Sequence, residues 1–237
     1  MMTKEKAADL ARGRGWLAAQ PVRFQEDLLA RCHLRSYREK EALYHVGDPC
    51  TGVFCLVSGA IKVEFAALGG EYKTAAVKQP VCWFGQGACF RRAGYLVAVT
   101  AATAITVLHL PVHEFERLIE NPAHCRSFAL LTLDHLDEAL LVLGQMLIGD
   151  VEGKIAARLT LLADAPGQGQ PIVVPITQQD LAEMCGLSRP TVQQALASLE
   201  RRGLVRAGYR KIEILDLPNL LGHRGNAVAM TAATKIA

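Results

Sequence analysis

Several side chains that make directed hydrogen bonds gather just after Ser188. They are Arg189, Thr191, Gln193 and Gln194. The Arg guanidinium presents a planar pair of donors that matches guanine O6 and N7, and a Gln amide matches adenine N6 and N7. The hydroxyls of Ser188 and Thr191 suit phosphate oxygens, as does the positive end of a helix dipole. This set of residue types is typical of a helix that enters a DNA major groove by its N-terminal end.

The flanking residues predict that this helix is the second one of a helix-turn-helix. Thr177 and Asp180 have the spacing of a capping box, which starts a first helix. Gly186 supplies the turn between the helices, Ser188 can cap the second helix, and Pro190 is tolerated in its first turn. The positions expected to face inward as a small core are Leu181, Cys185, Leu187, Val192 and Leu196.

A hairpin is expected directly after the motif, with strands over 204–207 and 211–215. Arg206, Arg210 and Lys211 would lie beside the duplex as a basic wing. The alternative interpretation is a helix-turn-helix that serves only protein packing. The exposed polar set favours DNA binding.

Upstream, the sequence between Ser36 and His109 is made of short β-rich runs separated by turn signals. Their spacing of roughly ten residues indicates an antiparallel sandwich or jelly-roll barrel. One helix is expected before the strands, over 24–34, and another after them, from Pro111 to Glu120. The expected strands cover 42–46, 53–57, 61–65, 72–77, 96–100 and 104–109.

A leucine-rich segment over 123–149 predicts a helix about 40 Å long. Its leucines follow the 3-4-3-4 spacing of a coiled-coil seam, which indicates a dimer helix that also packs on its own sensor domain. An ordinary core helix is the alternative. Asp150 interrupts the heptad, so the helix is expected to kink or restart near Gly149. The seam residues are Leu133, Leu136, Leu140, Leu143 and Leu147.

These elements predict an α+β chain in four parts. The expected parts are a jelly-roll sensor domain over 1–120, a dimerisation helix over 121–150, a winged-helix domain over 151–221 and a frayed tail over 222–237. The third part would contain a helix over 151–162, a turn-rich loop over 164–171 and a strand over 172–176.

The composition excludes some classes of protein but does not identify a binding partner. With 51% apolar residues in 237, the chain can bury a core, which excludes a disordered class. A net charge of +3 is too small to identify a nucleic-acid binder by itself. Seven scattered cysteines form no C-x-x-C pair, so neither a zinc site nor a thioredoxin-type motif is expected. Free thiols and an N-terminus without an apolar run favour a cytoplasmic protein.

One uncharged stretch, 94–112, has nearly the length of a membrane span. Its Val, Thr and Ile content, together with His109 and Pro111, favours a half-buried strand instead. No membrane partner is therefore expected.

Five features occur in a recognisable order along the chain: Gly47-Asp48, the run Val53–Gly59, Phe84-Gly85, the leucine-rich helix and the helix-turn-helix. Over roughly residues 24–218 the sequence resembles the Crp/Fnr family of bacterial transcription regulators. The resemblance implies a jelly-roll effector domain, a dimer helix and a winged helix. It also implies base-edge contacts for Arg189 and Gln194. Pro190 replaces the acidic residue common in cyclic-AMP responders, which implies a different target pattern.

The effector pocket is expected around Phe84, Gly85, Gln86 and Tyr95. Cyclic-nucleotide binders of this family carry Phe-Gly-Glu followed about ten residues later by Arg-Ser/Thr-Ala. Here Gln86 replaces the carboxylate, and the expected Arg falls near Tyr95. A buried phosphate without a cation is strongly disfavoured, so cyclic AMP is disfavoured as the effector unless the loop is rebuilt around Arg91 or Arg92.

Other cofactors are also disfavoured or unassigned. An iron–sulfur cluster needs clustered N-terminal cysteines, and residues 1–31 contain none. A haem ligand could be named among four histidines, but a lone His is more often structural. Cys82 and Cys89 flank the pocket and could sense oxidants, although small buried hydrophobes are the simpler interpretation. The haem candidates are His33, His45, His109 and His113.

The sequence thus predicts a homodimeric regulator, not an enzyme, that binds a near-palindromic duplex and carries an unidentified effector site or none. RNA polymerase is a candidate further partner. Two rivals remain. A cupin-like metal enzyme needs a His-x-His cluster, whereas the expected barrel offers His45 and His109. A ligand-binding module would use the helix-turn-helix for packing.

Overall fold

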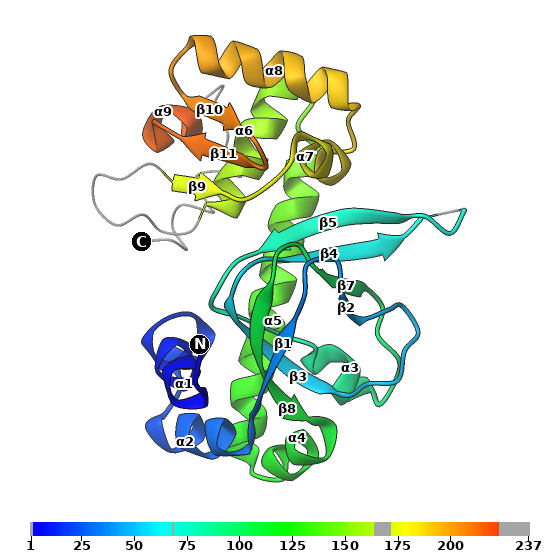
Figure 1. Ribbon diagram of the computed structural model, residues 1–237, viewed down its shortest axis with the longest axis vertical. Helices are drawn as coiled ribbons and strands as arrows, with labels where there is room; N and C mark the ends of the chain where they lie inside the picture. Colours follow the sequence, from blue (N-terminus) through cyan, green and yellow to red (C-terminus); the bar gives the residue numbers. More distant parts are fainter. Residues whose placement is uncertain (1, 68, 164–171, 223–237) are drawn as a thin grey trace. The chain divides into compact units, whose positions relative to one another are not determined.

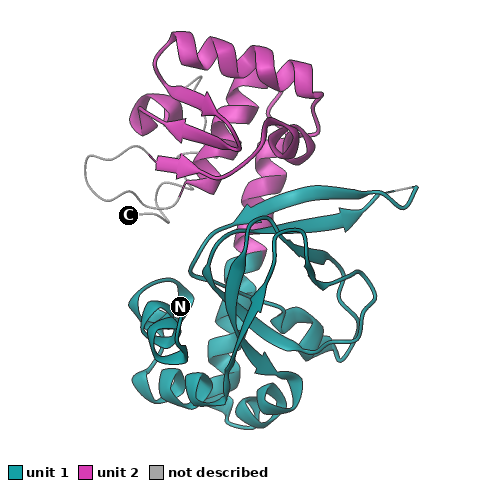
Figure 2. Cartoon of the chain, viewed as in Figure 1, with its two compact units in different colours: residues 1–135 teal, residues 136–237 magenta. Residues whose placement is uncertain are grey.

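The computed structural model describes residues 2–67, 69–163 and 172–222. The chain divides into two compact units, residues 1–135 and 136–237 (Figure 2). The loop expected over 164–171 and nearly all of the tail expected over 222–237 lie outside the described residues.

Unit 1 contains two four-stranded antiparallel sheets (Figure 1). The strand orders are β1-β8-β3-β6 and β2-β7-β4-β5, the order of a double-sheet jelly roll rather than of a closed barrel. The first sheet contains β1 (His33–Tyr37), β8 (Ile105–Pro111), β3 (Gly52–Ser58) and β6 (Cys82–Phe84). The second contains β2 (Ala42–Tyr44), β7 (Ala98–Ala101), β4 (Ile61–Ala66) and β5 (Tyr72–Lys78).

Two strands and three helical segments of unit 1 were absent from the sequence-based expectation. The helix expected over 24–34 is α2 (Val22–Arg31), and the chain then enters β1. Residues of β1 pair with β8 from His33↔His109 to Tyr37↔Ile105, so a distant part of the chain decides their conformation. The other additions are β6, α1 (Lys4–Gly13), the 3₁₀ helix η1 (Trp16–Ala19) and α3 (Gln86–Arg91).

An aromatic core lies between the first sheet and the surrounding helices. Phe24 of α2, Phe115 of α4 (Val112–Ile119) and Phe128 of α5 (Pro122–Met146) are almost fully buried there. The Trp16 ring packs edge-on against Trp83, and its indole N–H donates to the Ser127 carbonyl at 3.0 Å. Helix α1 adds Ala7 and Ala11, both fully buried.

Helix α5 ends at Met146, three residues before the expected end. The next helix, α6 (Val151–Leu162), starts where Asp150 accepts a hydrogen bond from the Gly153 N–H at 2.7 Å. The predicted restart near Gly149 is therefore confirmed, and its cause is the N-cap at Asp150. Leu147 lies in the turn after α5, so it is not part of the helical seam.

In the described residues of unit 2, four helices (α6 to α9) pack on a small antiparallel sheet in the order β10-β11-β9. A single apolar cluster joins them and includes Leu181, Cys185, Val192 and Leu196, while Leu187 packs at its edge. Its elements after α6 are β9 (Ile172–Val174), α7 (Gln178–Cys185), α8 (Arg189–Arg201), β10 (Val205–Gly208), β11 (Lys211–Ile214) and α9 (Leu217–Leu221).

Candidate nucleic-acid interface

The turn between α7 and α8 is fixed by local hydrogen bonds. The Thr177 hydroxyl oxygen accepts from the Asp180 N–H at 3.0 Å, and the Asp180 carboxylate accepts from the Thr177 N–H at 3.3 Å. This is the predicted capping box. Gly186 has φ +64°, and the following N–H, of Leu187, donates to the Ala182 carbonyl at 2.9 Å. The geometry sets the direction in which α8 leaves the turn.

The two hydroxyls at the start of α8 are engaged with each other. Ser188 Oγ accepts from the Thr191 N–H at 3.2 Å and lies 2.7 Å from Thr191 Oγ1. Ser188 is therefore the N-cap that the sequence predicts. Only one of the two hydroxyl protons is used in the contact between them, so the other can still reach an external acceptor.

The opposite faces of α8 differ in what they contact. Val192, Leu196 and Leu199 are buried in the unit 2 core and hold the helix in place. Arg189 and the pair Gln193 and Gln194 are exposed. Within the described part of the chain, these three make no hydrogen bond or ion pair that would occupy their side chains. Their donors and acceptors are thus available to an external ligand.

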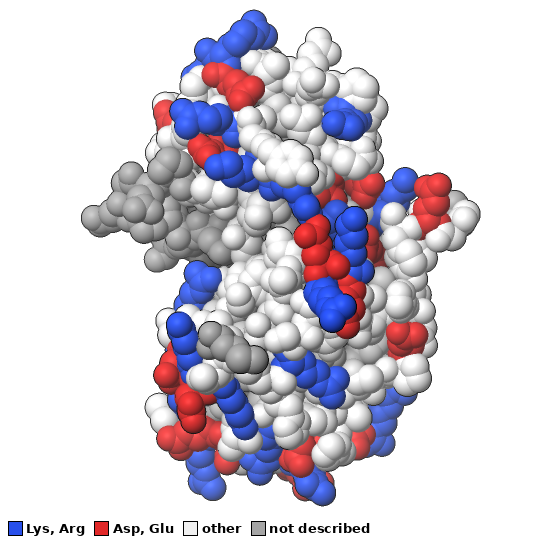
Figure 3. All heavy atoms as spheres, in the orientation of Figure 1, with Lys and Arg blue, Asp and Glu red and all other residues white. Residues whose placement is uncertain are grey.

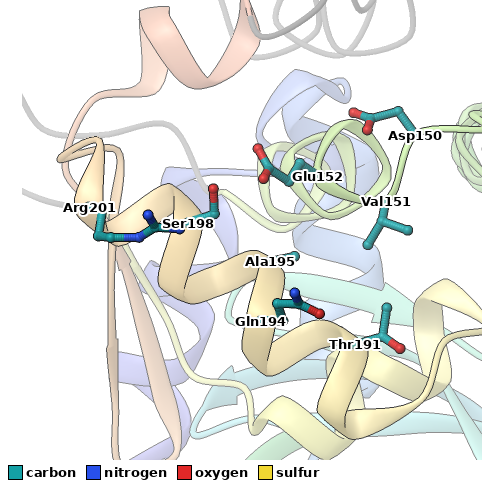
Figure 4. Close-up of a pocket in the computed structure, with 8 residues that line it drawn as sticks. All are labelled: Asp150, Val151, Glu152, Thr191, Gln194, Ala195, Ser198 and Arg201. Atoms are coloured by element: carbon teal, nitrogen blue, oxygen red, sulfur yellow. The ribbon is translucent and has the colours of Figure 1, made fainter.

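A groove of about 330 Å³ runs along one flank of α8, between this helix and the start of α6 (Figure 4). Thr191 and Gln194 line it from α8, and Asp150 and Glu152 line it from the α6 side. The Glu152 carboxylate pairs with Arg202 at 3.2 Å, which offsets part of the negative charge. A ligand can therefore reach the Gln194 side chain through this groove.

The hairpin after α8 is less basic than its sequence indicates. Glu213 pairs with Lys211 at 2.7 Å and with Arg206 at 3.2 Å. Lys211, and then Arg206, lower the pKa of this carboxyl group. At the hairpin tip, Tyr209 is 91% exposed and Arg210 has φ +55°. Two of the three cations expected to form a basic wing are therefore partly neutralised within the hairpin.

The surface charges shown in Figure 3 do not mark a separate region that would bind a polyanion. On the face shown in Figure 3, Lys and Arg side chains are interspersed with Asp and Glu. This distribution agrees with a net charge of +3 and leaves the local geometry of α8 as the main indication of a nucleic-acid interface.

The residues expected to form an effector pocket divide into two groups in unit 1. Phe84 and Tyr95 both lie against the Tyr44 ring, at centroid distances of 6.4 Å and 3.6 Å. The Tyr95 hydroxyl accepts from the Thr51 N–H at 3.0 Å and donates to the Gly52 carbonyl at 3.2 Å. Tyr95 therefore fastens the β2–β3 loop to the core.

Gln86 is directed elsewhere. Its side chain is 3% exposed, and its amide nitrogen lies 2.9 Å from Nδ1 of His135 on α5. The amide oxygen has no hydrogen-bond partner among the described residues. Gly85 directs this segment, since φ is +97° and an added Cβ would lie 2.8 Å from the Gly52 carbonyl oxygen. The link between Gln86 and His135 was not foreseen from the sequence.

The two arginines that could have replaced the missing cation do not lie in the core. Arg91 and Arg92 are both exposed, and Arg92 pairs with Glu116 of α4 at 3.3 Å. The loop is thus not rebuilt in the way that a buried phosphate would need.

His109, one of the four haem candidates, has a structural role. It is 2% exposed, lies 4.6 Å from the Phe54 ring centroid, and its Nε2 lies 3.1 Å from the Thr51 carbonyl oxygen. Burial, with Arg35 nearby, lowers the pKa of His109 to about 4. Across the described ranges, no group of three or more His, Cys, Asp or Glu side chains is arranged to hold a metal ion.

The seam leucines of α5 are open to solvent in the single chain. Leu133, Leu136, Leu140 and Leu143 are 53–59% exposed, although they follow one face of a regular helix. Leu147, beyond the helix end, is 81% exposed. None of the helices in the described residues is long and apolar enough to cross a bilayer.

A jelly-roll domain followed by a long helix and a winged helix-turn-helix defines a class of DNA-binding transcription regulators. The family model of a cyclic nucleotide-binding domain matches residues 34–121, and that of a Crp-like helix-turn-helix domain matches residues 153–222. The chain belongs to the Crp/Fnr family of transcription regulators. It is a DNA-binding regulator of that family.

Two similar proteins illustrate the relation in sequence. The cAMP-activated global transcriptional regulator CRP of Escherichia coli O6:H1 is 27% identical over 194 residues, which cover 80% of this chain and 92% of the relative. The cAMP-activated regulator Vfr of Pseudomonas aeruginosa is 27% identical over 192 residues, which cover 76% and 88%.

Solved structures agree in fold. FixK2 from Bradyrhizobium japonicum superposes with a TM-score of 0.72 at 20% identity, covering 81% of this chain and 96% of that one. A CRP-family transcriptional regulator from Thermus thermophilus gives 0.67 at 24% identity, covering 82% and 98%.

Proposed function

We propose that the protein binds a near-palindromic DNA duplex as a homodimer, with α8 of each protomer in a major groove. The observation that carries the proposal is the division of α8 into two faces. Val192, Leu196 and Leu199 fix the helix, whereas Arg189, Gln193 and Gln194 are exposed with their hydrogen-bonding groups unused by the described chain.

The roles follow from side-chain chemistry. Arg189 and Gln194 read base edges, Arg189 as a bidentate donor to guanine and Gln194 as a donor and acceptor to adenine. Gln193 contacts a neighbouring base or phosphate. The Ser188 and Thr191 hydroxyls and the N-terminus of α8 bind a phosphate, and Arg210 contacts the backbone from the hairpin. Because Arg206 and Lys211 share Glu213, the hairpin contributes less charge than its composition indicates.

The dimer is formed along α5. Four leucines at 3-4-3 spacing, each more than half exposed, form a stripe that a second copy of the same helix would bury. A two-fold arrangement of this kind would place two α8 helices about one DNA turn, roughly 34 Å, apart. The helix would thus set the spacing of the half-sites.

A selection from random duplexes tests this proposal. The full-length protein is incubated with the library, bound duplexes are sequenced, and native mass spectrometry counts chains per duplex. We expect an inverted repeat whose half-site centres are about 10 base pairs apart, with two chains bound. An enriched motif without a repeat, bound by one chain, would contradict the proposal.

The sensor domain is proposed to respond to an effector other than cyclic AMP. The relatives above are named as cAMP-activated, but here a buried amide, Gln86, stands where a carboxylate would accept the ribose hydroxyl. Arg91 and Arg92, the nearby cations, are exposed. A phosphate in this core would therefore lack its partner. The buried Gln86 oxygen, which has no hydrogen-bond partner among the described residues, instead offers an acceptor to a polar, uncharged ligand.

Titration of the selected duplex with and without millimolar cyclic AMP tests this point. We expect the two Kd values for the duplex to agree within a factor of about two. A ligand that binds neither conformational state of the protein preferentially cannot shift the equilibrium between them. A tenfold or greater tightening of DNA binding by cyclic AMP would contradict it.

A cytoplasmic location and contact with RNA polymerase complete the proposal. Neither a metal enzyme nor a module that only binds a ligand is needed to account for the fold.

A further inference from the structure

Two cysteines that lie 39 residues apart in the sequence meet in unit 1. Cys50 lies in the loop between β2 and β3, and Cys89 lies in α3. Their Sγ atoms are 3.0 Å apart, and both residues are free thiols. A disulfide has a bond of about 2.05 Å, so a closing movement of about 1 Å would join them. Cys82 and Cys89 flank the expected pocket in the sequence, but the sulfur in contact with Cys89 is that of Cys50.

The two thiols have different surroundings. Cys89 is 3% exposed, whereas Cys50 is half-buried and packs at the border of two apolar clusters of unit 1. Hydrogen bonds from Cys89, from the Tyr95 hydroxyl and from the Gly52 N–H lower the pKa of Cys50. The contact with Cys50, together with burial, raises the pKa of Cys89. Cys50 is thus the more accessible and more readily ionised thiol of the pair, and Cys89 is the sheltered one.

We propose that Cys50 and Cys89 form a thiol-oxidation site, which a peroxide converts into an intramolecular disulfide. The proposal stands apart from the DNA-binding function, because it concerns chemistry within unit 1.

The reaction balances in two steps. The Cys50 thiolate attacks one oxygen of hydrogen peroxide, an S–O bond forms, the O–O bond breaks, and the leaving hydroxide takes a proton to become water. The product is a sulfenic acid at Cys50. The Cys89 sulfur then attacks the Cys50 sulfur, an S–S bond forms, the S–O bond breaks, and the departing hydroxide takes the Cys89 proton. Two thiols and one peroxide give one disulfide and two waters.

The second step becomes easier after the first. Part of the resistance of Cys89 to deprotonation comes from its contact with the Cys50 sulfur. Oxidation of Cys50 removes the thiolate charge, so the Cys89 thiol loses the negative neighbour that opposed its ionisation.

Three other cysteines are poor competitors for peroxide. Cys32, Cys55 and Cys185 are buried, and burial raises the pKa of each thiol. Cys82 and Cys125 are half-buried like Cys50, and Cys125 serves as the matched control. The site is therefore defined by the 3.0 Å contact between the Cys50 and Cys89 sulfurs, not by burial alone.

A disulfide here would tie the β2–β3 loop to α3. The loop is already held by Tyr95, and α3 begins at Gln86. The cross-link would therefore act on both parts of unit 1 in which the effector pocket is expected.

Peptide mass spectrometry of the full-length protein tests the proposal. The folded protein is treated with a small excess of hydrogen peroxide, free thiols are alkylated, and the protein is digested without reduction. We expect a linked peptide pair that contains Cys50 and Cys89, two hydrogens lighter than the separate peptides, which dithiothreitol splits. The variant Cys125→Ser should give the same linked pair.

A second measurement identifies the first thiol to react. In Cys89→Ser, we expect a sulfenic acid at Cys50, trapped by dimedone, and no disulfide from Cys50 to another thiol of the same chain. If Cys50 and Cys89 are both still alkylated as free thiols in protein that has been treated with peroxide and remains folded, the proposal is overturned. A cross-link that forms only between two chains would also overturn it.

Discussion

The polar side chains of the two units are placed in opposite ways. In unit 2, Arg189, Gln193 and Gln194 project from a helix whose other face is packed, and the described chain leaves them unused. In unit 1, His109 and Gln86 are buried and held by contacts with Thr51 and His135. A surface for a large ligand needs exposed groups on a rigid support, whereas a sensor core needs internal groups whose state can change with a small molecule or an oxidant.

This difference gives the two units separate experimental signals. Both tryptophans of the chain, Trp16 and Trp83, belong to unit 1. Tryptophan fluorescence therefore follows the unfolding of unit 1 alone, while circular dichroism follows both units. A change in the stability of one unit can therefore be measured apart from the other.

The largest expected effect comes from Gly52→Ala in the jelly roll. Gly52 has φ +145°, and an added Cβ would clash with the Leu110 carbonyl oxygen in the adjacent strand. We expect a loss of more than about 3 kcal/mol in the unfolding free energy of unit 1, followed by tryptophan fluorescence in urea. The matched control is Gly47→Ala, where φ is +86° but no atom lies within 4 Å of the added Cβ. Equal losses of unfolding free energy in both variants would show that the clash with the Leu110 carbonyl oxygen is not the cause.

Leu140→Glu is expected to act on DNA affinity without unfolding either unit. Leu140 is 56% exposed, so the substitution creates no buried charge in the single chain, but it would place one in a dimer seam. We expect monomers in sedimentation and a loss of about 100-fold in affinity for a palindromic duplex, or about 2.7 kcal/mol. Ala123→Glu, at an exposed position in the first turn of α5, should leave both unchanged. A dimeric Leu140→Glu protein would place the interface elsewhere.

Acid should destabilise unit 1 through His109. The folded pKa of about 4 is below the ordinary value of 6.5, so between these values the unfolded chain binds a proton that the folded chain does not. Unit 1 should thus be fully stable above about pH 6.5 and lose up to about 3 kcal/mol as pH falls to 4. His109→Gln keeps a donor for the Thr51 carbonyl but does not titrate. If both proteins show the same slope in fluorescence-monitored urea unfolding, His109 is not the responsible group.

The smallest expected effect is that of Ser188→Ala in unit 2. Loss of the N-cap should lower the stability of unit 2 by about 1 kcal/mol. The change should be visible by circular dichroism and absent from the tryptophan signal. Thr191→Ala keeps the cap and should cost less. A shift in the tryptophan transition of Ser188→Ala would mean that the two units do not unfold separately.

The same comparison explains what the sequence could predict. The helix-turn-helix was predicted residue by residue, because Thr177, Asp180, Gly186 and Ser188 act on neighbours within a few positions. A jelly roll was predicted from the strand spacing and the family resemblance, but the order of its strands was not. By contrast, β1 was assigned partly to a helix, because its conformation depends on a distant strand.

The region in which an effector pocket is expected shows the limit of sequence-based prediction more sharply. Gln86 meets His135 across 49 residues, and Cys50 meets Cys89 across 39. Neither pair forms a local motif, so spacing could not reveal it. In the hairpin, the sequence showed Arg206 and Lys211 as cations but could not show that Glu213 lies between them. The contact roles of the α8 residues and the seam leucines remain predictions.

The central claim, that α8 reads base sequence through Arg189, is tested most directly by paired titrations at fixed salt. Fluorescence anisotropy would give the Kd values of wild type, Arg189→Ala and Arg91→Ala for a selected duplex and for a scrambled one. Arg91→Ala is the control, because it removes an exposed arginine of unit 1. We predict that Arg189→Ala loses about 1–3 kcal/mol on the selected duplex and much less on the scrambled one, with Arg91→Ala unchanged on both. An equal loss for Arg189→Ala on the two duplexes would contradict the account, because the arginine would then contact only the backbone.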